Sequence, residues 1–165
     1  MAKKGFNIYL VSRTEEKLKK LADKIKSESG VDVKYRAKDF AKSYEDGFFD
    51  DIFEDTSNLD VSIVINNVGM AKRRDPNADN TKIFRDILAC NTVGQTLLTD
   101  KFLQRMDKRE QKSAIINLSS FQGGKPLVLN PLYSATKGYN DFYSRANYHE
   151  FKDKIDISKS SSSNV

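Results

Sequence analysis

The sequence has few of the residues that mark secreted or membrane-spanning proteins. Its 165 residues include one cysteine, Cys90, three prolines and eight glycines. A single cysteine cannot form a disulfide within the chain, which favours a reducing compartment. The purely apolar stretches are short, such as Ile63–Ile65, so none is expected to span a membrane. The opening residues, MAKKGFN, lack the apolar core of a signal peptide. Judged on its sequence alone, the chain is expected to be soluble and cytoplasmic.

The composition is that of a globular protein, with 38% apolar and 31% charged residues. A chain of this length is about one domain and can bury a sizeable core. The net charge of +5 comes from 28 basic and 23 acidic residues, and only Lys72-Arg73-Arg74 forms a dense basic run. Interleaved charge is typical of a solvated surface, so we expect no nucleic-acid binding, whereas a mild positive bias suits phosphorylated cofactors. No metal-ligand spacing is present, and no metal is expected.

Apolar patterning predicts strands that alternate with helices. Strands are expected at Phe6–Ser12, Val31–Ala37, Val61–Ile65 and Ala114–Leu118. Helices are expected after each of them: one with Leu18, Leu21, Ala22 and Ile25, one with Tyr44, Phe48, Ile52 and Phe53, one from about Thr81 to Met106 interrupted near Asn91, and one carrying Tyr133 and Lys137. This order implies parallel β-α-β units with right-handed crossovers.

Open α/β sheets bind ligands at the carboxyl ends of their strands, so the residues there are site candidates. Arg13 follows the first strand and can meet the 2′-phosphate of NADP, although a plain surface arginine is the alternative. Asp39 follows the second and can accept a hydrogen bond from adenine or cap a helix. Asn66 begins Asn-Asn-Val-Gly after the third strand, where paired asparagines can hold strand ends together and Gly69 lets a ligand approach. Ser120 ends the fourth.

Tyr133 and Lys137 are four residues apart in NPLYSATKGYNDF and share one face of a helix. A free tyrosine has a pKa near ~10, and an ammonium group held nearby favours the phenolate and lowers that value. A tyrosine tuned in this way can exchange a proton with the oxygen of a ketone or an alcohol. A serine from another strand end, such as Ser120, could fix the carbonyl oxygen. The alternative is two neighbours on an amphipathic helix.

Four motifs together resemble the short-chain dehydrogenase/reductase superfamily over Gly5 to about Lys154. NNVG is similar to the family's Asn-Asn-Ala-Gly motif, INLSS followed by YSATK is similar to its Ser…Tyr-x-x-x-Lys signature, and ACNTVG contains the additional active-site asparagine. The segments FNIYLVSRTEEKL, NNVGM and YSATKGYNDFYSRA are most similar to the branch of very-long-chain 3-oxoacyl-CoA reductases and related 17-beta-hydroxysteroid dehydrogenases.

The resemblance implies a role for each catalytic candidate. Tyr133 would be the general acid/base, and Lys137 would hold the nicotinamide ribose and lower the pKa of that tyrosine. Ser120 would orient the substrate carbonyl, and Asn91 would hold a water in a proton relay. The implied reaction reduces a ketone, 3-oxoacyl-CoA or steroid-like, to an alcohol.

The resemblance also implies NADP(H) as the cofactor. Arg13 would favour NADPH, Asp39 would lie near adenine, and Asn66 would lie along the cofactor. The loop at residues 121–132 would help to shape an apolar substrate pocket. Relatives in this branch sit at the endoplasmic reticulum through an upstream hydrophobic segment, which this sequence does not contain.

The fold class expected is α/β, an incomplete Rossmann-like doubly wound parallel sheet that lacks the first strand and the Gly-rich loop. Residues 1–157 would form this partial domain, and the serine-rich residues 158–165 would be a disordered tail. The chain resembles one cut at both ends. Without the missing strand, the first two strands have no direct neighbour that links them to the others. The chain is expected to be weak or inactive by itself; the alternative is a non-catalytic remnant that pairs with another chain, or with its own copy, through exposed strand edges.

Overall fold

The computed structural model describes residues 1–162, and the chain forms two compact units that divide between Phe40 and Ala41. Every strand pairs in parallel with its neighbour, in one sheet of order β1-β2 and another of order β3-β4-β5. The expected parallel α/β class is therefore confirmed. Within the described residues no hydrogen-bonded strand pair links the sheets, as the sequence predicted. The partial domain predicted for residues 1–157 includes the whole first unit and most of the second.

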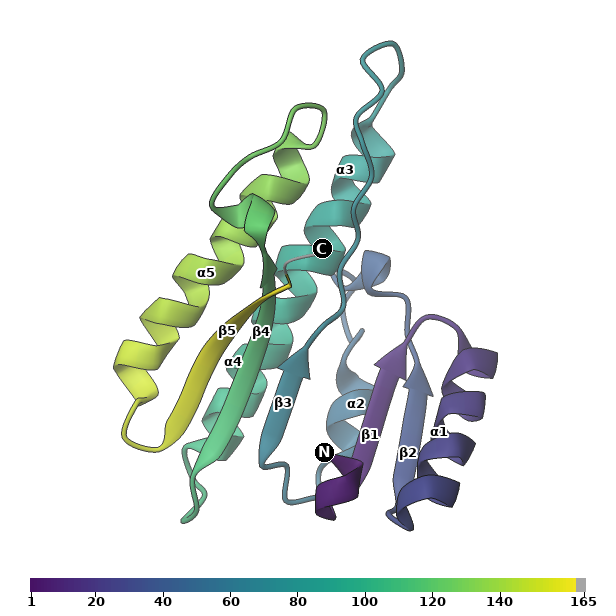
Figure 1. Cartoon of the computed structure of the whole chain (residues 1–165), viewed down its shortest axis with the longest axis vertical. Helices are drawn as coiled ribbons and strands as arrows, with labels where there is room; N and C mark the ends of the chain where they lie inside the picture. Colours follow the sequence, from purple (N-terminus) through teal and green to yellow (C-terminus); the bar gives the residue numbers. More distant parts are fainter. Residues whose placement is uncertain (163–165) are drawn as a thin grey trace. The chain divides into compact units, whose positions relative to one another are not determined.

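The first unit is a β-α-β arrangement (Figure 1). Its elements are η1 (Ala2–Lys4), β1 (Ile8–Ser12), α1 (Glu15–Ser29) and β2 (Val33–Ala37). Leu18 and Ala22 of α1 are buried together with Val33 of β2, so the apolar stripe of the helix covers this small sheet. The helix ends at Gly30, whose φ of +66° is the left-handed conformation that glycine adopts without steric strain.

The second unit contains the three-stranded sheet and the longer helices (Figure 1). After η2 (Phe40–Lys42), which spans the division, its elements are α2 (Asp50–Asp55), β3 (Ile63–Asn66), α3 (Thr81–Leu88), η3 (Ala89–Val93), α4 (Gly94–Met106), β4 (Ser113–Ser120), η4 (Phe121–Gly123), α5 (Pro131–Phe151) and β5 (Ile155–Ser162). No helix within residues 1–162 combines the length and apolar character needed to cross a membrane.

The core of the second unit lies between its sheet and α4. Phe102, Leu103 and Met106 pack on apolar side chains of all three strands, including Ile115, which has no exposed surface. Every second residue of β4 is buried, which is the period of a strand whose one face is covered by helices. Phe151 of α5 also packs against this cluster, so α4 and α5 cover the same face of the sheet.

The long helix expected over residues 81–106 is interrupted where the sequence predicted. Residues Ala89–Val93 form a π-helical turn centred on Asn91, between α3 and α4. Such turns insert one extra residue into a helix and occur frequently at functional sites. The helix expected around Tyr44 is shorter than predicted, because Gly47 has a φ of +72° and α2 begins only at Asp50. A right-handed helix cannot pass through that conformation.

The expected disorder from Ser158 is wrong for residues 158–162, which continue β5 beside β4. The register runs from Ser113 opposite Ile155 to Ser120 opposite Ser162. A strand ladder uses only backbone N–H and C=O groups, which serine supplies as well as any apolar residue. Residues 163–165 of the predicted tail lie outside the described residues.

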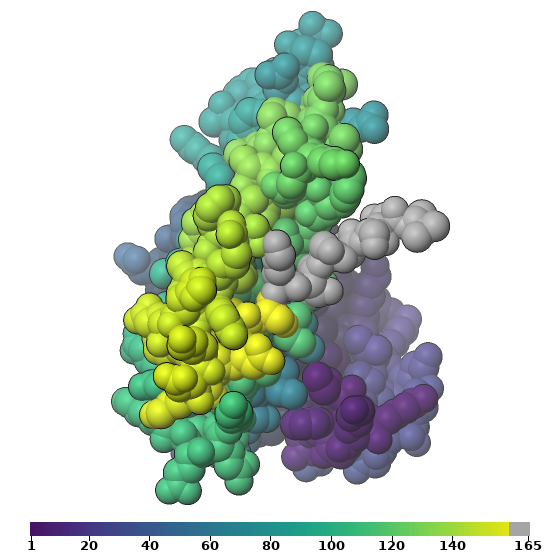
Figure 2. Space-filling model, turned by 60° about the vertical axis from the view of Figure 1, so that its left-hand side comes forward, coloured from purple at the N-terminus to yellow at the C-terminus, as the bar shows by residue number. Residues whose placement is uncertain are grey.

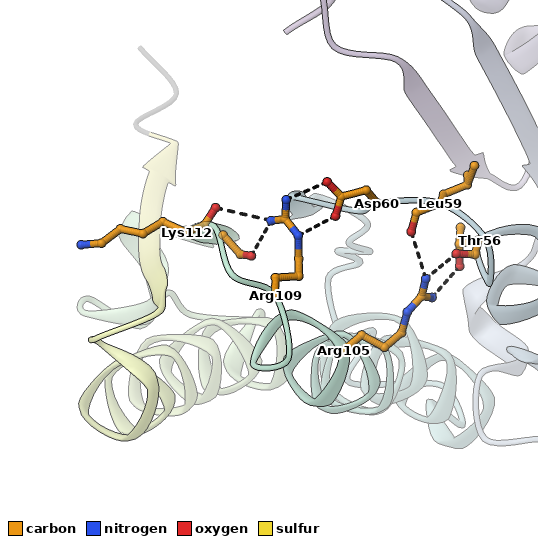
Figure 3. A network of polar contacts seen from close by, with 7 residues as sticks. Thr56, Leu59, Asp60, Arg105, Arg109 and Lys112 are labelled. Atoms are coloured by element: carbon orange, nitrogen blue, oxygen red, sulfur yellow. Dashed lines mark hydrogen bonds and ion pairs between the residues drawn. The ribbon is translucent and has the colours of Figure 1, made fainter.

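Two arginines near the end of α4 tie the connection between α2 and β3 to the rest of the second unit (Figure 3). Arg105 donates to Thr56 and to the carbonyl of Leu59, and Arg109 forms a two-pronged ion pair with Asp60 at 2.6 and 2.9 Å. The Arg109 guanidinium holds the pKa of the Asp60 carboxyl below its usual value through these hydrogen bonds. This network precedes the amino ends of β3 and β4 and leaves their carboxyl ends free for the site.

Candidate active site

Tyr133 and Lys137 occupy the first turns of α5, directly after Pro131, which suits the first position of a helix. The Lys137 ammonium lies 5.7 Å from the centre of the Tyr133 ring. Lys137 is 5% exposed, and this burial lowers its pKa because desolvation disfavours the charged form. Its Nζ donates to the carbonyl of Leu118 at 2.7 Å, which leaves two of the three ammonium hydrogens for a ligand.

The backbone of Gly69 borders this buried ammonium on an exposed side of the site. A Cβ added to Gly69 would lie 3.6 Å from Nζ of Lys137 and 3.7 Å from Oδ1 of Asn91. The loop after β3, the π-helical turn and α5 therefore converge at one point. Because glycine has no side chain, a ligand can approach the backbone there.

Asn91 fixes the loop after β3 to the start of α5. Its side chain is fully buried, and its Oδ1 accepts from the Met70 N–H at 2.7 Å. Its Nδ2 donates to the Met70 carbonyl at 2.9 Å and to Oγ1 of Thr136 at 3.0 Å. Thr136 in turn donates to the Tyr133 carbonyl at 2.7 Å. One chain of hydrogen bonds thus runs from Met70 to the turn that carries Tyr133, while the expected water at Asn91 stays a prediction.

The end of β4 is held against α5 at the candidate lysine. Ser119 is buried and donates to the Lys137 carbonyl at 2.9 Å. Ser120 is half-buried, and its Oγ accepts from the Gln122 N–H at 3.3 Å, so its hydroxyl hydrogen can still be donated. A Cβ added to Gly123 would lie 2.8 Å from the Lys137 carbonyl carbon, closer than such atoms approach. Only glycine lets the loop pass α5 at this distance.

Asn66 faces the interior, where its amide joins two strands. It is 8% exposed, and its Nδ2 donates to Oδ1 of Asn117 at 2.7 Å and to Oγ1 of Thr99 at 2.8 Å. Asn117 is its register partner in β4 and donates to Oγ of Ser144 in α5 at 2.9 Å. The expectation that an asparagine here holds neighbouring strand ends together is confirmed. A cofactor contact of Asn66 stays a prediction.

Four residues of this arrangement were not identified from the sequence: Ser119, Gly123, Asn117 and Thr136. Asn117 and Ser119 are two apart in β4, and strand alternation could have assigned both to the helix-covered face. Thr136 directly precedes Lys137, but nothing in its position shows that it would meet Asn91. No local pattern marks Gly123, because its role depends on how closely a distant helix approaches.

Arg13 and Asp39, the two candidates for binding the adenosine end of a cofactor, belong to the first unit. Ser12 and Ala37 form the last register pair of its sheet, and the Lys38 N–H extends the pairing by donating to the Ser12 carbonyl at 2.9 Å. Arg13 and Asp39 therefore follow at the same edge of that sheet, and the Arg13 side chain is exposed. Their contacts with a cofactor stay a prediction.

The apolar loop at residues 121–132 is largely exposed, and its expected part in a substrate pocket stays a prediction. Leu127 is 50% exposed and Val128 is 89% exposed, because no other described element packs over them. Leu129 has a φ of +62°, a left-handed conformation that costs a non-glycine residue about 1 kcal/mol. Its carbonyl accepts from the Arg74 N–H at 2.8 Å, a contact that holds the loop in this conformation.

A separate apolar groove of about 510 Å³ lies on the other side of α5. It runs between the π-helical turn, the start of α4 and α5, and its walls include Leu88, Val93, Leu97, Leu132 and Tyr139. Neither Tyr133 nor Lys137 lines it. Lys137 instead contacts the end of β4, at the Leu118 carbonyl.

Comparison with known families agrees with the geometry. The family model described as short chain dehydrogenase matches residues 1–160. The rat very-long-chain 3-oxoacyl-CoA reductase is 34% identical over 160 residues, which are 93% of this chain and 49% of that protein. The human 17-beta-hydroxysteroid dehydrogenase type 3 is 35% identical over 158 residues, with coverage of 93% and 49%. The resemblance to this branch is confirmed, and the chain spans about half the length of these relatives.

Solved structures share the fold. A 7beta-hydroxysteroid dehydrogenase superimposes with a TM-score of 0.88 at 23% identity, over 97% of this chain and 62% of that one. At this identity the likeness shows the fold alone. A short-chain dehydrogenase from Sphingobium yanoikuyae in complex with NADPH has a TM-score of 0.87 at 25% identity, with coverage of 97% and 62%. The L-sorbose reductase of Gluconobacter frateurii, complexed with NADPH and L-sorbose, has a TM-score of 0.83 at 26% identity, with coverage of 96% and 60%.

Proposed function

Because this chain belongs to the short-chain dehydrogenase family, we propose that it carries the acid/base half of an NADPH-dependent oxidoreductase that reduces a ketone to an alcohol. The observation that carries the proposal is the pairing of Tyr133 with the buried ammonium of Lys137, 5.7 Å from its ring. A buried cation beside a phenol at the carboxyl ends of parallel strands is suited to proton transfer rather than to packing.

Tyr133 acts as the general acid in this scheme. Its hydroxyl gives a proton to the carbonyl oxygen of the substrate as the carbonyl carbon is reduced. The phenolate that remains is stabilised by the positive charge of Lys137. The phenolate later recovers a proton from solvent. Ser120 donates its free hydroxyl hydrogen to the same carbonyl oxygen and orients it. The Asn91–Thr136 chain holds the turn that carries Tyr133, so that the hydroxyl is in position before substrate binds.

The residues at the site fit a nicotinamide cofactor, which supplies the hydride when it is bound. The two unused hydrogens of the Lys137 ammonium, beside the bare backbone of Gly69, suit the hydroxyls of a ribose. Arg13 suits the 2′-phosphate that distinguishes NADPH from NADH, and Asp39 suits the adenine amino group. The NADPH complexes of structural relatives support this choice.

The substrate is a 3-oxoacyl thioester or a steroid-like ketone, the two classes named in its relatives. Both are largely apolar, in keeping with the exposed Leu127 and Val128 that precede Tyr133. The location at the endoplasmic reticulum expected for this branch stays a prediction.

The test is product formation at high protein concentration. The 165-residue chain would be incubated with NADPH and a 3-oxoacyl-CoA, and the 3-hydroxyacyl-CoA would be measured by mass spectrometry. General acid catalysis contributes roughly 100- to 10,000-fold, so Tyr133→Phe should lower the rate by at least about 100-fold. Tyr148→Phe is the matched control, since Tyr148 is also on α5 but lies outside the site and is 41% exposed.

Two results would refute the proposal. Equal rates for wild type and Tyr133→Phe would show that Tyr133 is not the acid. The absence of product from wild type, on this substrate and on a steroid ketone, would show that the chain is not catalytic.

A further inference from the structure

The basic run noticed in the sequence, Lys72-Arg73-Arg74, lies on the exposed loop between β3 and α3. All three side chains are exposed, and within residues 1–162 none forms an ion pair with an acidic side chain. Unpaired adjacent cations repel one another, and they are favourable where an anion is bound. Nothing in the acid/base chemistry proposed above uses them.

This basic run is joined to the apolar loop before α5. The Arg74 N–H donates to the Leu129 carbonyl at 2.8 Å, so the backbone of the basic run meets the apolar loop at Leu129. Figure 2 shows the two loops together at the top of the view, one in teal and one in green. Tyr133 is four positions after Leu129, and the chain between them spans at most about 14 Å. The basic run is therefore joined through its backbone to the segment that leads to the candidate acid.

The acidic side chains of the same loop accept hydrogen bonds from nearby backbone N–H groups. Oδ1 of Asp75 accepts from the Asn77 N–H at 2.9 Å, and Oδ1 of Asp79 accepts from the Thr81 N–H at 2.8 Å, at the start of α3. The bonds to Thr81 hold the pKa of the Asp79 carboxyl below its usual value. Lys125 of the apolar loop is a fourth cation, 5.2 Å from the centre of the Phe121 ring. The joined surface is apolar at one loop and cationic at the other.

We propose that Lys72, Arg73 and Arg74 form the subsite for the phosphate groups of an acyl carrier, so that the substrate is an acyl thioester of coenzyme A rather than a neutral steroid. The inference rests on the proposed function, because it names the substrate of the same site. Arginine binds phosphate through two parallel hydrogen bonds, and lysine adds a point charge. Leu127, Val128 and Leu129 contact the apolar part of that substrate. A steroid ketone offers no anionic group that would use the run.

An anionic lipid surface would present similar phosphates, but the structure favours the carrier. The backbone contact between Arg74 and Leu129 connects the run to the segment that leads to Tyr133. Binding to a membrane would require only that the basic run be exposed, and the contact between Arg74 and Leu129 would not strengthen it.

The test compares one acyl group on two carriers. The triple variant Lys72→Gln, Arg73→Gln, Arg74→Gln would be measured with 3-oxoacyl-CoA and with the same acyl group on N-acetylcysteamine, which has no phosphate. Coenzyme A alone would be titrated by calorimetry with saturating NADPH present, so that the cofactor site is filled. The matched control Lys108→Gln, Lys112→Gln, Lys152→Gln removes the same charge from exposed lysines at the other end of the second unit.

The expected result is a loss of at least about 10-fold in coenzyme A affinity and in kcat/KM for the coenzyme A thioester. The N-acetylcysteamine thioester should change by less than about twofold, and the control variant should match wild type on both. The wild-type affinity for coenzyme A should also fall as salt rises from 50 to 200 mM, because these charges are screened.

Three results would overturn the inference: unchanged coenzyme A affinity in the triple variant, an equal loss on both thioesters, or loss of binding to phosphatidylserine vesicles with coenzyme A binding intact. If no substrate is turned over but coenzyme A binding depends on the run, the subsite stands and the proposed reaction fails. If both thioesters are reduced alike by the triple variant and wild type, the reaction stands and the subsite fails.

Discussion

Gly123→Ala is predicted to destabilise the second unit through a single methyl group. The added Cβ would lie 2.8 Å from the carbonyl carbon of Lys137, 2.9 Å from its oxygen and 3.1 Å from the Gly138 nitrogen. These are backbone atoms of α5 and cannot rotate away as a flexible side chain would. The loop or the helix must therefore shift, and forced overpacking of this kind costs about 1–3 kcal/mol. A shift at Lys137 would also disturb its bond to Leu118 and the bond from Ser119.

Gly124→Ala is the matched control, because its added Cβ would meet only the Phe121 carbonyl oxygen, at 4.0 Å. It should be neutral, or stabilise by roughly 0.4–1 kcal/mol through a less flexible unfolded chain. Urea unfolding followed by far-UV circular dichroism would measure both variants, since the sequence has no tryptophan. With a slope of about 2 kcal/mol per M, a loss of about 2 kcal/mol lowers the midpoint by roughly 1 M. Equal midpoints for the two variants would refute the close approach of loop and helix.

Two further predictions concern Thr136 and Tyr143 of α5. Thr136→Val removes the hydroxyl that accepts from Asn91, and it should lower the free energy of unfolding by about 1–2 kcal/mol. Thr136→Ser keeps the hydroxyl and should lower it by less. Equal urea midpoints for the two variants would contradict the hydrogen bond from Asn91. Burial raises the pKa of Tyr143 to about 12, with smaller contributions from the charges of Tyr139 and Asp100. Because the folded state holds this proton more tightly, its stabilisation is complete below pH 10 and is lost between about pH 10 and 12. Urea midpoints across this range should fall less steeply for Tyr143→Phe, and an unchanged slope would count against the shift.

Much of the site follows from local patterns. The spacing of Tyr133 and Lys137 places both on one helix face whatever surrounds them, because side chains four apart in a helix are neighbours. Gly30 ends α1 in a left-handed conformation that excludes most other residues, so a glycine there is a local signal of the helix end. Asn66 could be assigned a strand-bridging role because parallel strands in register bring their carboxyl ends together.

Other features have no local signal. Serine disfavours an ordered prediction at residues 158–162, yet β5 forms because β4 offers it a complete row of backbone partners. The helix expected from Tyr44 is cut short by the conformation of Gly47, which a pattern of apolar residues does not reveal.

The sequence by itself determined the parallel α/β class, the interruption at Asn91 and the placement of Tyr133 and Lys137 on one helix face, since each depends on residue type and spacing along a few turns or strands. Tertiary structure alone decided that Asn91 forms hydrogen bonds with Met70, that Gly123 lies against the backbone of Lys137, and that the basic run at Arg74 meets the apolar loop at Leu129. Each of these contacts joins residues that are 14 to 55 positions apart. Their meeting depends on how the helices pack on the sheet, which no local stretch of sequence specifies.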